Sequence, residues 1–385
     1  MFGDASGSFT YVNPARIHWG GGCLPERLSH EVSELGAERV FVITTRSVHG
    51  NPALSGEVRD VLGARLAGAF PGIGQHAPVA SVAAAARAAS EVRADALVSF
   101  GGGSPIDAAK SVAFALATGL DLSAADAVVQ ARGMHPRPGE LVPHIAVPTT
   151  LSAAELSGLA GFTTEGEREK VGLRDAALIP SAVIFDAELS LHTPLQLWLS
   201  TGIRAVDHAV ETVLAPGSHP FSDVLALEAL RRLQSSLLAT KADPRDLEAR
   251  TESQLGAWFS FTLPGPAASG LSHTLGKRIG SRHDIPHGIT SCLLLPHVMR
   301  FFQRRTPARL GRIAGALGVD TREMPVEQAA ACAADAVAEL IERLELPHHL
   351  GGYGLSDADL EAAARPVASA EFPLEDLVEI YHAAL

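Results

Sequence analysis

The first half of the chain alternates short apolar runs with longer segments of helical character. Four runs rich in β-branched and aromatic residues predict strands, and they span residues 39–44, 95–100, 144–148 and 182–186. The segments between them are long enough for helices, and the clearest is the alanine-rich stretch 81–94, which lacks glycine and proline. Continuous apolar strands joined by helices are typical of a parallel sheet that is covered on both faces. Residues 1–188 are therefore predicted to form an α/β domain.

From Pro194 onward, apolar residues recur at helical spacing. One stripe consists of Val224, Leu227, Leu230, Leu233 and Leu237. Alanine-rich helices are also expected at 330–344 and 358–364, because alanine is the best helix former. No strand-like run of comparable quality follows residue 186, so residues 189–385 are predicted to form an all-α domain.

The composition narrows the class of protein. The chain has 385 residues, of which 46% are apolar and 19% charged, and this length favours two domains. A formal net charge of −12 disfavours binding to nucleic acid. No apolar stretch approaches the ~18 residues of a membrane span, and the N-terminus does not resemble a signal peptide. Three scattered cysteines are too few for a disulfide framework. We expect a cytoplasmic protein with no nucleic-acid or membrane partner.

A glycine-rich turn follows the second predicted strand and opens a helix. It consists of Gly101, Gly102, Gly103 and Ser104. Three glycines let the backbone turn tightly and approach a ligand, and the N–H groups of the first helical turn favour an anion such as pyrophosphate. The alternative is a plain strand-to-helix turn, which needs only one or two glycines. The turn is neither the G-x-G-x-x-G fingerprint nor a P-loop, because Lys110 lies too far inside the helix.

Two threonines, Thr149 and Thr150, end the third predicted strand. Ligands of open α/β sheets bind beyond the carboxyl ends of the strands, so these hydroxyls could bond a ribose or a phosphate. Threonines at a strand end are equally often the N-cap of a helix.

Three histidines, His208, His273 and His287, lie in the helical half. Three imidazoles can bind zinc or ferrous iron and leave one side of the ion open to substrate. A lone histidine is more often a satisfied core or surface group, and spacing alone does not separate these two interpretations.

Taken together, these motifs resemble the iron-containing (group III) alcohol dehydrogenase family, and within it most closely the maleylacetate reductase branch. The resemblance covers nearly the whole chain. Besides the glycine turn and the histidines, it is carried by Asp107, Lys110 and the segments 147–150, 201–202, 208–211 and 293–299.

This resemblance implies an N-terminal dinucleotide-binding domain and an all-α C-terminal domain, in the dehydroquinate synthase-like architecture, with NAD(P) and catalysis in the cleft between them. It also implies a homodimer and a lysine near the nicotinamide ribose, for which Lys170 is the matching residue.

The chain departs from the family pattern at two positions. Metal-dependent members carry an aspartate four residues before the first histidine, where this chain has Arg204, and a further catalytic histidine is replaced by Lys277. Asp207 lies roughly 100° around a helix from His208, so it cannot simply replace the missing aspartate as a metal ligand. Because the guanidinium removes the anionic ligand and adds positive charge, we expect no bound metal. Any metal that did bind would be held by His208, His273 and His287.

The resulting pocket is predicted to be strongly cationic. Its members are Arg204, His208, His273, Lys277 and His287. Such a cluster suits a small-molecule carboxylate substrate and can polarise a ketone oxygen without a metal. His273 is the preferred proton donor, because Lys277 on the same helix face could depress its pKa. The alternative is that Arg204 pairs with Asp207 or another acid and that the site is degenerate.

The nucleotide preference depends on the residue that follows the first predicted strand. NAD-preferring members of the family carry an aspartate there, which bonds the ribose 2′-OH and repels a 2′-phosphate. This chain has Thr45, followed by Arg46, so we expect both NADH and NADPH to be used.

Our leading hypothesis is an NAD(P)H-dependent, metal-independent reductase of a carboxylated keto or enoyl acid such as maleylacetate, which would yield 3-oxoadipate in the breakdown of aromatic compounds. The second hypothesis is a metal-dependent dehydrogenase of a small neutral alcohol, which metal analysis would distinguish. A lyase similar to dehydroquinate synthase would use NAD without net hydride transfer, so consumption of NAD(P)H would separate it. A non-catalytic binding module is poorly motivated, because the nucleotide motifs are intact.

Overall fold

The computed structural model describes Tyr11 and residues 13–385, apart from 125, 132, 138, 164–169 and 262–269. The chain forms two compact units, Val12–Thr193 and Pro194–Leu385, and Tyr11 belongs with the second. The predicted boundary after residue 188 falls inside a short helix, α7 (Ala187–Ser190), which stays with the first unit because Asp186 at the end of the sheet caps it. In the second unit, the ring of Tyr11 meets that of Phe221 edge-on, with centroids 5.6 Å apart.

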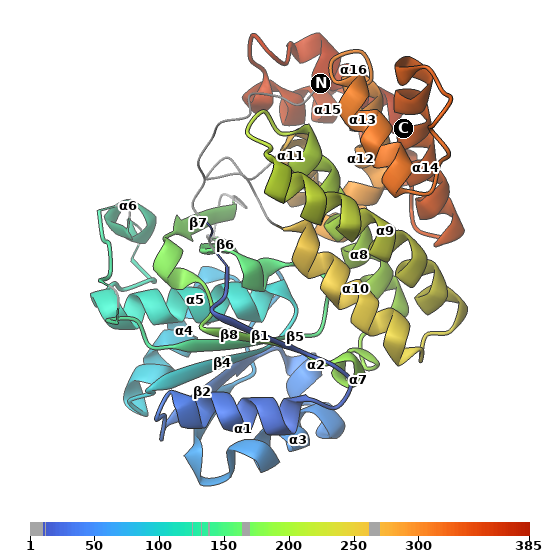
Figure 1. Ribbon diagram of the computed structural model, residues 1–385. Helices are drawn as coiled ribbons and strands as arrows, with labels where there is room; N and C mark the ends of the chain where they lie inside the picture. The colour runs from blue at the N-terminus through green and yellow to red at the C-terminus, as the bar shows by residue number, and fades with distance from the viewer. Residues whose placement is uncertain are drawn as a thin grey trace. The chain divides into compact units, whose positions relative to one another are not determined.

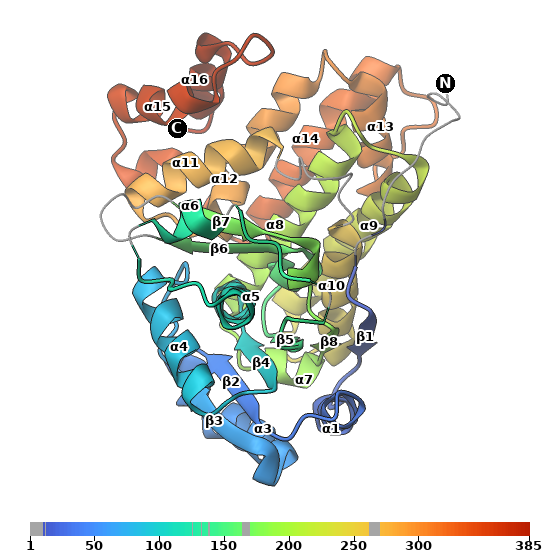
Figure 2. The same cartoon turned by 90° about the vertical axis from the view of Figure 1, so that its left-hand side faces the viewer.

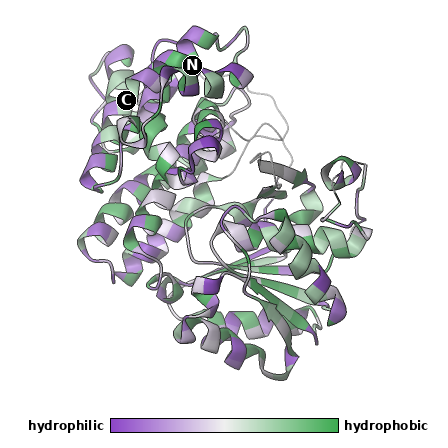
Figure 3. Cartoon of the chain, turned by 180° about the vertical axis from the view of Figure 1, so that it is seen from behind, coloured by the Kyte–Doolittle hydropathy of each residue, from purple (hydrophilic) through white to green (hydrophobic). Residues whose placement is uncertain are grey.

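The first unit is built on a six-stranded parallel sheet (Figure 1) in the order β1-β8-β5-β4-β2-β3. Its strands are β1 (Arg16–Trp19), β2 (Val40–Thr44), β3 (Leu66–Phe70), β4 (Ala96–Gly101), β5 (His144–Pro148) and β8 (Ala182–Phe185). The central strands β2, β4, β5 and β8 are buried at every position, as expected for a sheet with two covered faces. Figure 3 shows these strands as strongly hydrophobic ribbons.

Helices cover both faces of this sheet. One face packs against α1 (Leu24–Glu34) and α3 (Pro52–Leu62), and the other packs against α4 (Val79–Glu91) and α5 (Gly103–Thr118). A small antiparallel hairpin of β6 (Leu159–Thr163) and β7 (Lys170–Arg174) lies beside α5 (Figure 2). The remaining short helices are α2 (Arg46–His49), α6 (Ala127–Ala131), η1 (Gly63–Arg65), η2 (Ala154–Leu156) and η3 (Ala176–Leu178).

The described residues of the second unit form helices joined by loops, with no strand among them. Its helices are α8 (Leu195–Leu214), α9 (Pro220–Ala242), α10 (Leu247–Ser260), α11 (Leu271–His283), α12 (His287–Phe302), α13 (Pro307–Ala316), α14 (Val326–Arg343), α15 (Asp357–Ala364) and α16 (Leu374–Ala383), with the 3₁₀ turns η4 (Leu350–Tyr353) and η5 (Arg365–Val367). The central helix α8 is buried on all sides over most of its length and packs against α9, α10, α11 and α12.

The predicted fold class is confirmed, and the four predicted strands occur as β2, β4, β5 and β8. The predicted stripe on α9 is wrong at its start, because Val224 is 65% exposed whereas Leu230, Leu233 and Leu237 are fully buried. The buried face of the first turns consists instead of Ser222, Asp223 and Ala226. In the part of the chain that the structure describes, no helix combines the length and the hydropathy needed to cross a bilayer.

Candidate active site

The glycine turn joins β4 to α5 in the first unit. Gly101 has φ +138°, a conformation open mainly to glycine, and Gly102 is the N-cap of a helix that no side chain caps. A Cβ on Gly102 would lie 3.2 Å from the Thr150 side chain, and one on Gly103 would lie 3.1 Å from Ser152 Oγ. The glycines therefore let this turn approach the segment after β5, and the first N–H groups of α5 are placed as an anion site requires.

The two threonines lie at the carboxyl end of β5, next to this turn. Thr149 donates its N–H to the carbonyl of Gly101 over 2.9 Å, and Thr193 Oγ1 donates to the Thr149 carbonyl over 2.7 Å. Thr150 Oγ1 donates to Ser152 Oγ over 3.4 Å. Neither threonine is a helix N-cap, because η2 begins later and has Ala153 in that position.

Ser104, Asp107 and Lys110 lie on α5, at the end of the turn and just after it. Ser104 Oγ accepts the His76 N–H over 3.1 Å, and Asp107 is half-buried on α5. Lys110 is fully buried, and its Nζ donates to three carbonyls of the segment after β5, those of Ala154, Ser157 and Leu159. This lysine holds that segment against α5. Lys170 begins β7, but its side chain lies outside the described residues.

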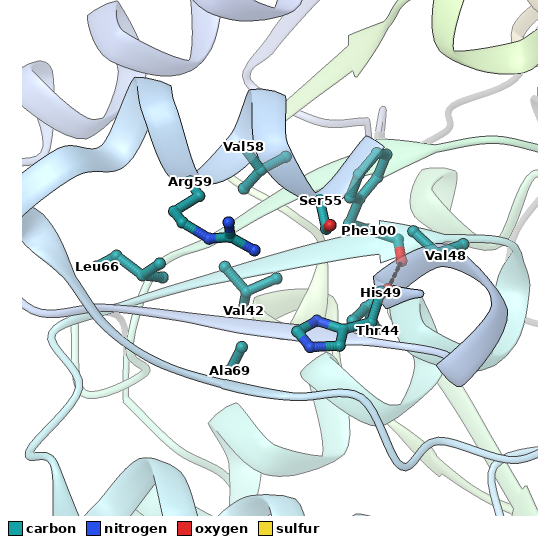
Figure 4. A pocket seen from close by; sticks show the side chains of 10 residues that line it. All are labelled: Val42, Thr44, Val48, His49, Ser55, Val58, Arg59, Leu66, Ala69 and Phe100. Carbon is teal, nitrogen blue, oxygen red and sulfur yellow. Dashed lines mark hydrogen bonds between the residues drawn. The ribbon is translucent and has the colours of Figure 1, made fainter. Parts of the chain in front are cut away.

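Thr45 and Arg46 lie at the carboxyl end of β2. Thr45 is the N-cap of α2, and its Oγ1 accepts the Val48 N–H over 3.3 Å. Arg46 follows on the exposed side of this short helix. A cavity of about 40 Å³ lies beneath α2 and α3 (Figure 4), bordered by Thr44, whose hydroxyl donates to the Phe100 carbonyl.

The second predicted site lies in the second unit, where α8, α11 and α12 pack together (Figure 1). His208 on α8 and His273 on α11 are both buried, and their rings lie 4.7 Å apart between centroids. His287 begins α12 and is half-buried. Ser291, one turn further along α12, contacts the same cluster through Asp207 and Arg204, so His287 lies on the helix face directed toward it.

Arg204 lies in this cluster but is not an isolated charge. Its Nη1 donates to Ser291 Oγ over 3.2 Å and lies 3.9 Å from Asp207 Oδ2. The same Asp207 oxygen accepts hydrogen bonds from Ser291 Oγ over 2.6 Å and from Ser272 Oγ over 3.0 Å. The pairing of Arg204 with Asp207, which is one part of the alternative interpretation, is therefore present in the structure.

A second carboxylate, that of Glu211, also lies in the cluster. Its Oε2 accepts the Gly270 N–H over 2.9 Å and its Oε1 accepts the His273 N–H over 3.1 Å, while His273 Nδ1 lies 2.7 Å from Oε2. The prediction of a strongly cationic pocket is wrong, because Asp207 and Glu211 offset the positive charges. Lys277, moreover, is exposed on α11.

The two buried histidines differ electrostatically. Burial, and then the charges of His273 and Arg204, hold the pKa of His208 well below its usual value. Burial and Arg204 also lower the pKa of His273, but Glu211 and Asp207 outweigh them and raise it overall. The expectation that Lys277 would depress the pKa of His273 is therefore wrong, because the neighbouring carboxylates dominate.

Sequence reasoning missed Glu211, Ser272 and Ser291 as parts of this site. A helical projection could have found Glu211, because residues 204, 207, 208 and 211 share one face of a helix. The two serines and the start of α11 come close only through packing between helices, which no local spacing reveals.

Comparison with known proteins identifies the family. Residues 14–187 match the family described as "Iron-containing alcohol dehydrogenase", and residues 198–384 match "Fe-containing alcohol dehydrogenase family, C-terminal". These two matches span both units. The chain belongs to the iron-containing alcohol dehydrogenase family, as its motifs predicted, and it is an oxidoreductase.

Several similar proteins are named maleylacetate reductases. Maleylacetate reductase 2 of Cupriavidus pinatubonensis is 35% identical over 318 residues, covering 83% of this chain and 80% of that protein. The maleylacetate reductase of Burkholderia cepacia is 30% identical over 358 residues, covering 93% and 90%. The crystal structure of maleylacetate reductase from Agrobacterium tumefaciens matches with a TM-score of 0.81 and 27% identity over 99% of each chain.

The family name implies a metal ion. Asp207, Glu211 and His273 do offer three ligand atoms within 4.8 Å of one another. Both carboxylates, however, already accept protein hydrogen bonds, and the Arg204 guanidinium lies 3.9 Å from Asp207. A divalent ion held by these three residues would have to displace these donors beside a fixed positive charge, so this set of ligands does not fit it.

Proposed function

We propose that this protein is a maleylacetate reductase that uses NADH or NADPH and needs no metal ion. The observation that carries the proposal is the position of Arg204, a cation bound to Ser291 and Asp207 where metal-dependent relatives would need a carboxylate. Similarity to named maleylacetate reductases over 83–93% of the chain supports the choice of substrate.

The chemistry requires positive charge and a proton, both of which the cluster can supply. Adding a hydride to the conjugated double bond of maleylacetate leaves negative charge on the ketone oxygen, and a proton must then reach the adjacent carbon. Bound NAD(P)H supplies the hydride. Arg204 would stabilise the developing charge, because it is held in a fixed, mostly buried position before the reaction begins. His273 would donate the proton, with His208 and His287 lining the site.

The other predicted residues retain proposed roles. Lys277 is exposed one turn beyond His273, so we assign it to a carboxylate of the substrate. The turn from Gly101 to Ser104 would bind the pyrophosphate. Asp107, Thr149, Thr150 and Lys170 would contact the rest of the nucleotide, and Thr45 and Arg46 would admit NADPH as well as NADH.

Two broader features belong to the same proposal. All three cysteines, Cys23, Cys292 and Cys332, are free, which fits a reducing cytoplasm. We also propose a homodimer, on the basis of the resemblance described above. Light scattering coupled to size exclusion would measure the mass directly, against the 40.2 kDa of one chain.

The proposal is tested by substrate and metal dependence measured together. NADH and NADPH oxidation should be rapid with maleylacetate and weak with small neutral aldehydes, and a chelator should leave the rate unchanged. Purified protein should contain well under one equivalent of iron or zinc. A stoichiometric metal ion together with chelator-sensitive activity would instead support the hypothesis of a metal-dependent alcohol dehydrogenase. Turnover of substrate without consumption of NAD(P)H would support the hypothesis of a lyase similar to dehydroquinate synthase.

The variant Arg204→Asp sharpens this test, because it restores the carboxylate of the metal-binding pattern. Metal-free kcat/KM should fall by at least ~100-fold, comparable with the loss of one oxyanion donor, and affinity for zinc or iron should rise. Arg204→Lys keeps the positive charge but loses the planar guanidinium with its paired N–H donors. Its metal-free kcat/KM should therefore lie between that of the wild type and that of Arg204→Asp. Full activity of Arg204→Asp in the presence of a chelator would contradict this mechanism.

A further inference from the structure

The guanidinium of Arg204 is held through only one of its three nitrogen atoms. Nη1 donates to Ser291 Oγ over 3.2 Å and lies 3.9 Å from Asp207 Oδ2. Nε and Nη2 form no hydrogen bond with the described residues, and 16% of the side chain is exposed. Together these two nitrogens form the edge of a guanidinium that donates two parallel hydrogen bonds to an anionic group. This edge is therefore available to a ligand.

The hydroxyl of Ser291 links Arg204 to Asp207 in a fixed direction. A hydroxyl has a single proton, and Ser291 Oγ donates it to Asp207 Oδ2 over 2.6 Å. The lone pairs of the same hydroxyl are then the groups that accept the N–H of Arg204. In such a chain each hydrogen bond polarises the next, so the link is stronger than two separate bonds.

Asp207 is in turn fixed from α11. It is fully buried, and its Oδ2 also accepts the hydroxyl of Ser272 over 3.0 Å and lies 3.4 Å from His273 Nδ1. Oδ1 is buried and has no hydrogen-bond partner in the part of the chain that the structure describes. The contacts of this carboxylate therefore converge on one oxygen, which cannot move without breaking bonds to α11 and α12 together.

A glycine lets α12 approach α8 closely enough for this contact. A Cβ on Gly288 would lie 2.8 Å from the backbone carbonyl of Ser200. Gly288 precedes Ser291 by three positions on α12, and Ser200 precedes Arg204 by four positions on α8. The two contacts therefore lie about one helical turn apart, and the close approach at the first sets the distance at the second.

We propose that Asp207 and Ser291 are positioning residues for the reduction: they hold Nη1 of Arg204 so that its Nε–Nη2 edge meets the substrate oxygen on which negative charge develops. A donor that is held in place before the reaction needs no reorganisation when the charge forms. The inference rests on the proposed function only where it places the substrate at this edge. The fixed guanidinium itself is a property of the resting protein.

The first test is the variant Ser291→Ala, which removes the link and leaves both charges in place. We expect kcat to fall by roughly 10- to 100-fold, the range for one hydrogen bond to a charged group. KM and the affinity for NAD(P)H should stay within about threefold, because the orientation of Arg204 matters most when the charge has developed. A kcat within about threefold of the wild type would overturn the inference.

A double variant distinguishes action through Arg204 from any separate role of Ser291. Arg204→Gln alone should lower kcat strongly. Adding Ser291→Ala to it should change kcat by less than about threefold, because the hydroxyl then has no guanidinium to hold. Losses that multiply would mean that Ser291 acts independently, and the inference would be wrong.

A matched control is Ser253→Ala, in the same unit. Ser253 is fully buried, and its hydroxyl lies 2.9 Å from that of Ser236, between α10 and α9 and outside the site. The same loss of a buried hydroxyl should leave kcat unchanged there. If Ser291→Ala does not fold, Gly288→Ala provides a second variant, because its methyl group pushes α12 away from Ser200 and lengthens the contact with Arg204 without changing a polar group.

The direct readout is nitrogen-15 NMR of arginine-labelled protein without substrate, with the Arg204 signals assigned from Arg204→Lys. A held guanidinium should show separate Nη1 and Nη2 signals in the wild type, which should merge by rotation in Ser291→Ala or Gly288→Ala. Merged signals in the wild type, or separate signals that persist in these variants, would overturn the inference. The expected change of signals in a protein that does not reduce maleylacetate would refute the proposed function and leave the positioning of Arg204 standing.

Discussion

At the scale of single residues, Arg204 illustrates how a buried charge is kept in the site. Burial lowers the pKa of Arg204, and the charges of Asp207 and Glu211 counteract that effect. An arginine in such a setting remains protonated, because its pKa starts several units above neutral. The ion pair therefore keeps a fixed cation inside the helical unit.

The glycine turn gives a prediction at the same scale. Gly102→Val should abolish NADH and NADPH binding, because a Cβ there already lies 3.2 Å from the Thr150 side chain and the branched group must push the turn out of place. The measurement is nucleotide affinity by fluorescence titration, with circular dichroism to establish that the variant folds.

Gly56→Ala is the matched control for this variant. Gly56 lies within α3, and a Cβ there would meet nothing within 4 Å. It should bind nucleotide normally and gain about 0.5–1 kcal/mol of stability, since alanine in a helix loses less entropy on folding than glycine. A folded Gly102→Val variant with unchanged nucleotide affinity would refute the assignment of the turn.

At the scale of elements, Asp186 ties two helices to the end of β8. Its carboxylate accepts the N–H groups of Gly22 and Leu24 at the start of α1, over 2.9 and 2.8 Å, and that of Glu188 at the start of α7, over 2.9 Å. Cys23, the N-cap residue of α1, provides no side-chain cap, so Asp186 replaces it from a distant part of the chain.

Asp186→Ala should destabilise the first unit by about 3 kcal/mol, because it removes two helix caps and leaves buried N–H groups unpaired. Urea unfolding followed by circular dichroism measures this loss. Asp121→Asn is the control, since the carboxylate of this exposed aspartate accepts the N–H and the hydroxyl of its turn neighbour Ser123 and caps no helix of the described residues. A loss below about 0.5 kcal/mol for Asp186→Ala would mean that the caps contribute little.

The elements also show how far the sequence could predict the fold. The strands β2, β4, β5 and β8 were predictable because they are buried on both faces and therefore apolar throughout. The edge strands β1 and β3 were missed for a physical reason. Strand β1 is partly exposed and begins with the charged residue Arg16. Strand β3 has the sequence L-A-G-A-F and consists mostly of small residues with low strand propensity.

For the candidate site, the sequence was informative where spacing within one helix was enough. Arg204 and His208 are four positions apart on one face of α8, and Arg204 pairs with Asp207, which is three positions away. The cap that Glu211 provides to Gly270 joins residues 59 positions apart. Such a contact depends on how α8 packs against α11, which the sequence pattern alone does not determine.

At the scale of the whole molecule, two buried groups of the first unit should shape the pH dependence of stability. Burial raises the pKa of Glu155 to about 7, and its carboxylate has no hydrogen-bond partner among the described residues. Burial, followed by the charge of Lys110, lowers the pKa of His144 to about 3, and its Nε2 lies 2.7 Å from Ser99 Oγ. In the folded protein Glu155 is therefore mostly neutral below pH 7, and His144 is mostly neutral above pH 3.

The two groups act on stability in opposite directions. Glu155 binds its proton more tightly when folded, so its contribution is complete below the unfolded pKa of 4.5 and is lost as pH rises through 7. His144 excludes its proton when folded, so its contribution is complete above the unfolded pKa of 6.5 and is lost as pH falls toward 3. Between pH 4.5 and 6.5 the two slopes should cancel.

Variants of each group alone should reveal the two pH dependences of the free energy of unfolding that cancel in the wild type. Relative to the wild type, Glu155→Gln lacks the Glu155 slope, so its free energy of unfolding should gain roughly 3 kcal/mol on that of the wild type across this interval, at about 1.36 kcal/mol per pH unit. His144→Gln lacks the His144 slope, and its free energy of unfolding should lose a similar amount relative to the wild type. The double variant should follow the pH dependence of the wild type. Urea denaturation at half-unit steps of pH measures all four proteins, and deviations from the wild type of the same sign in the two single variants would contradict the assignment of both buried groups.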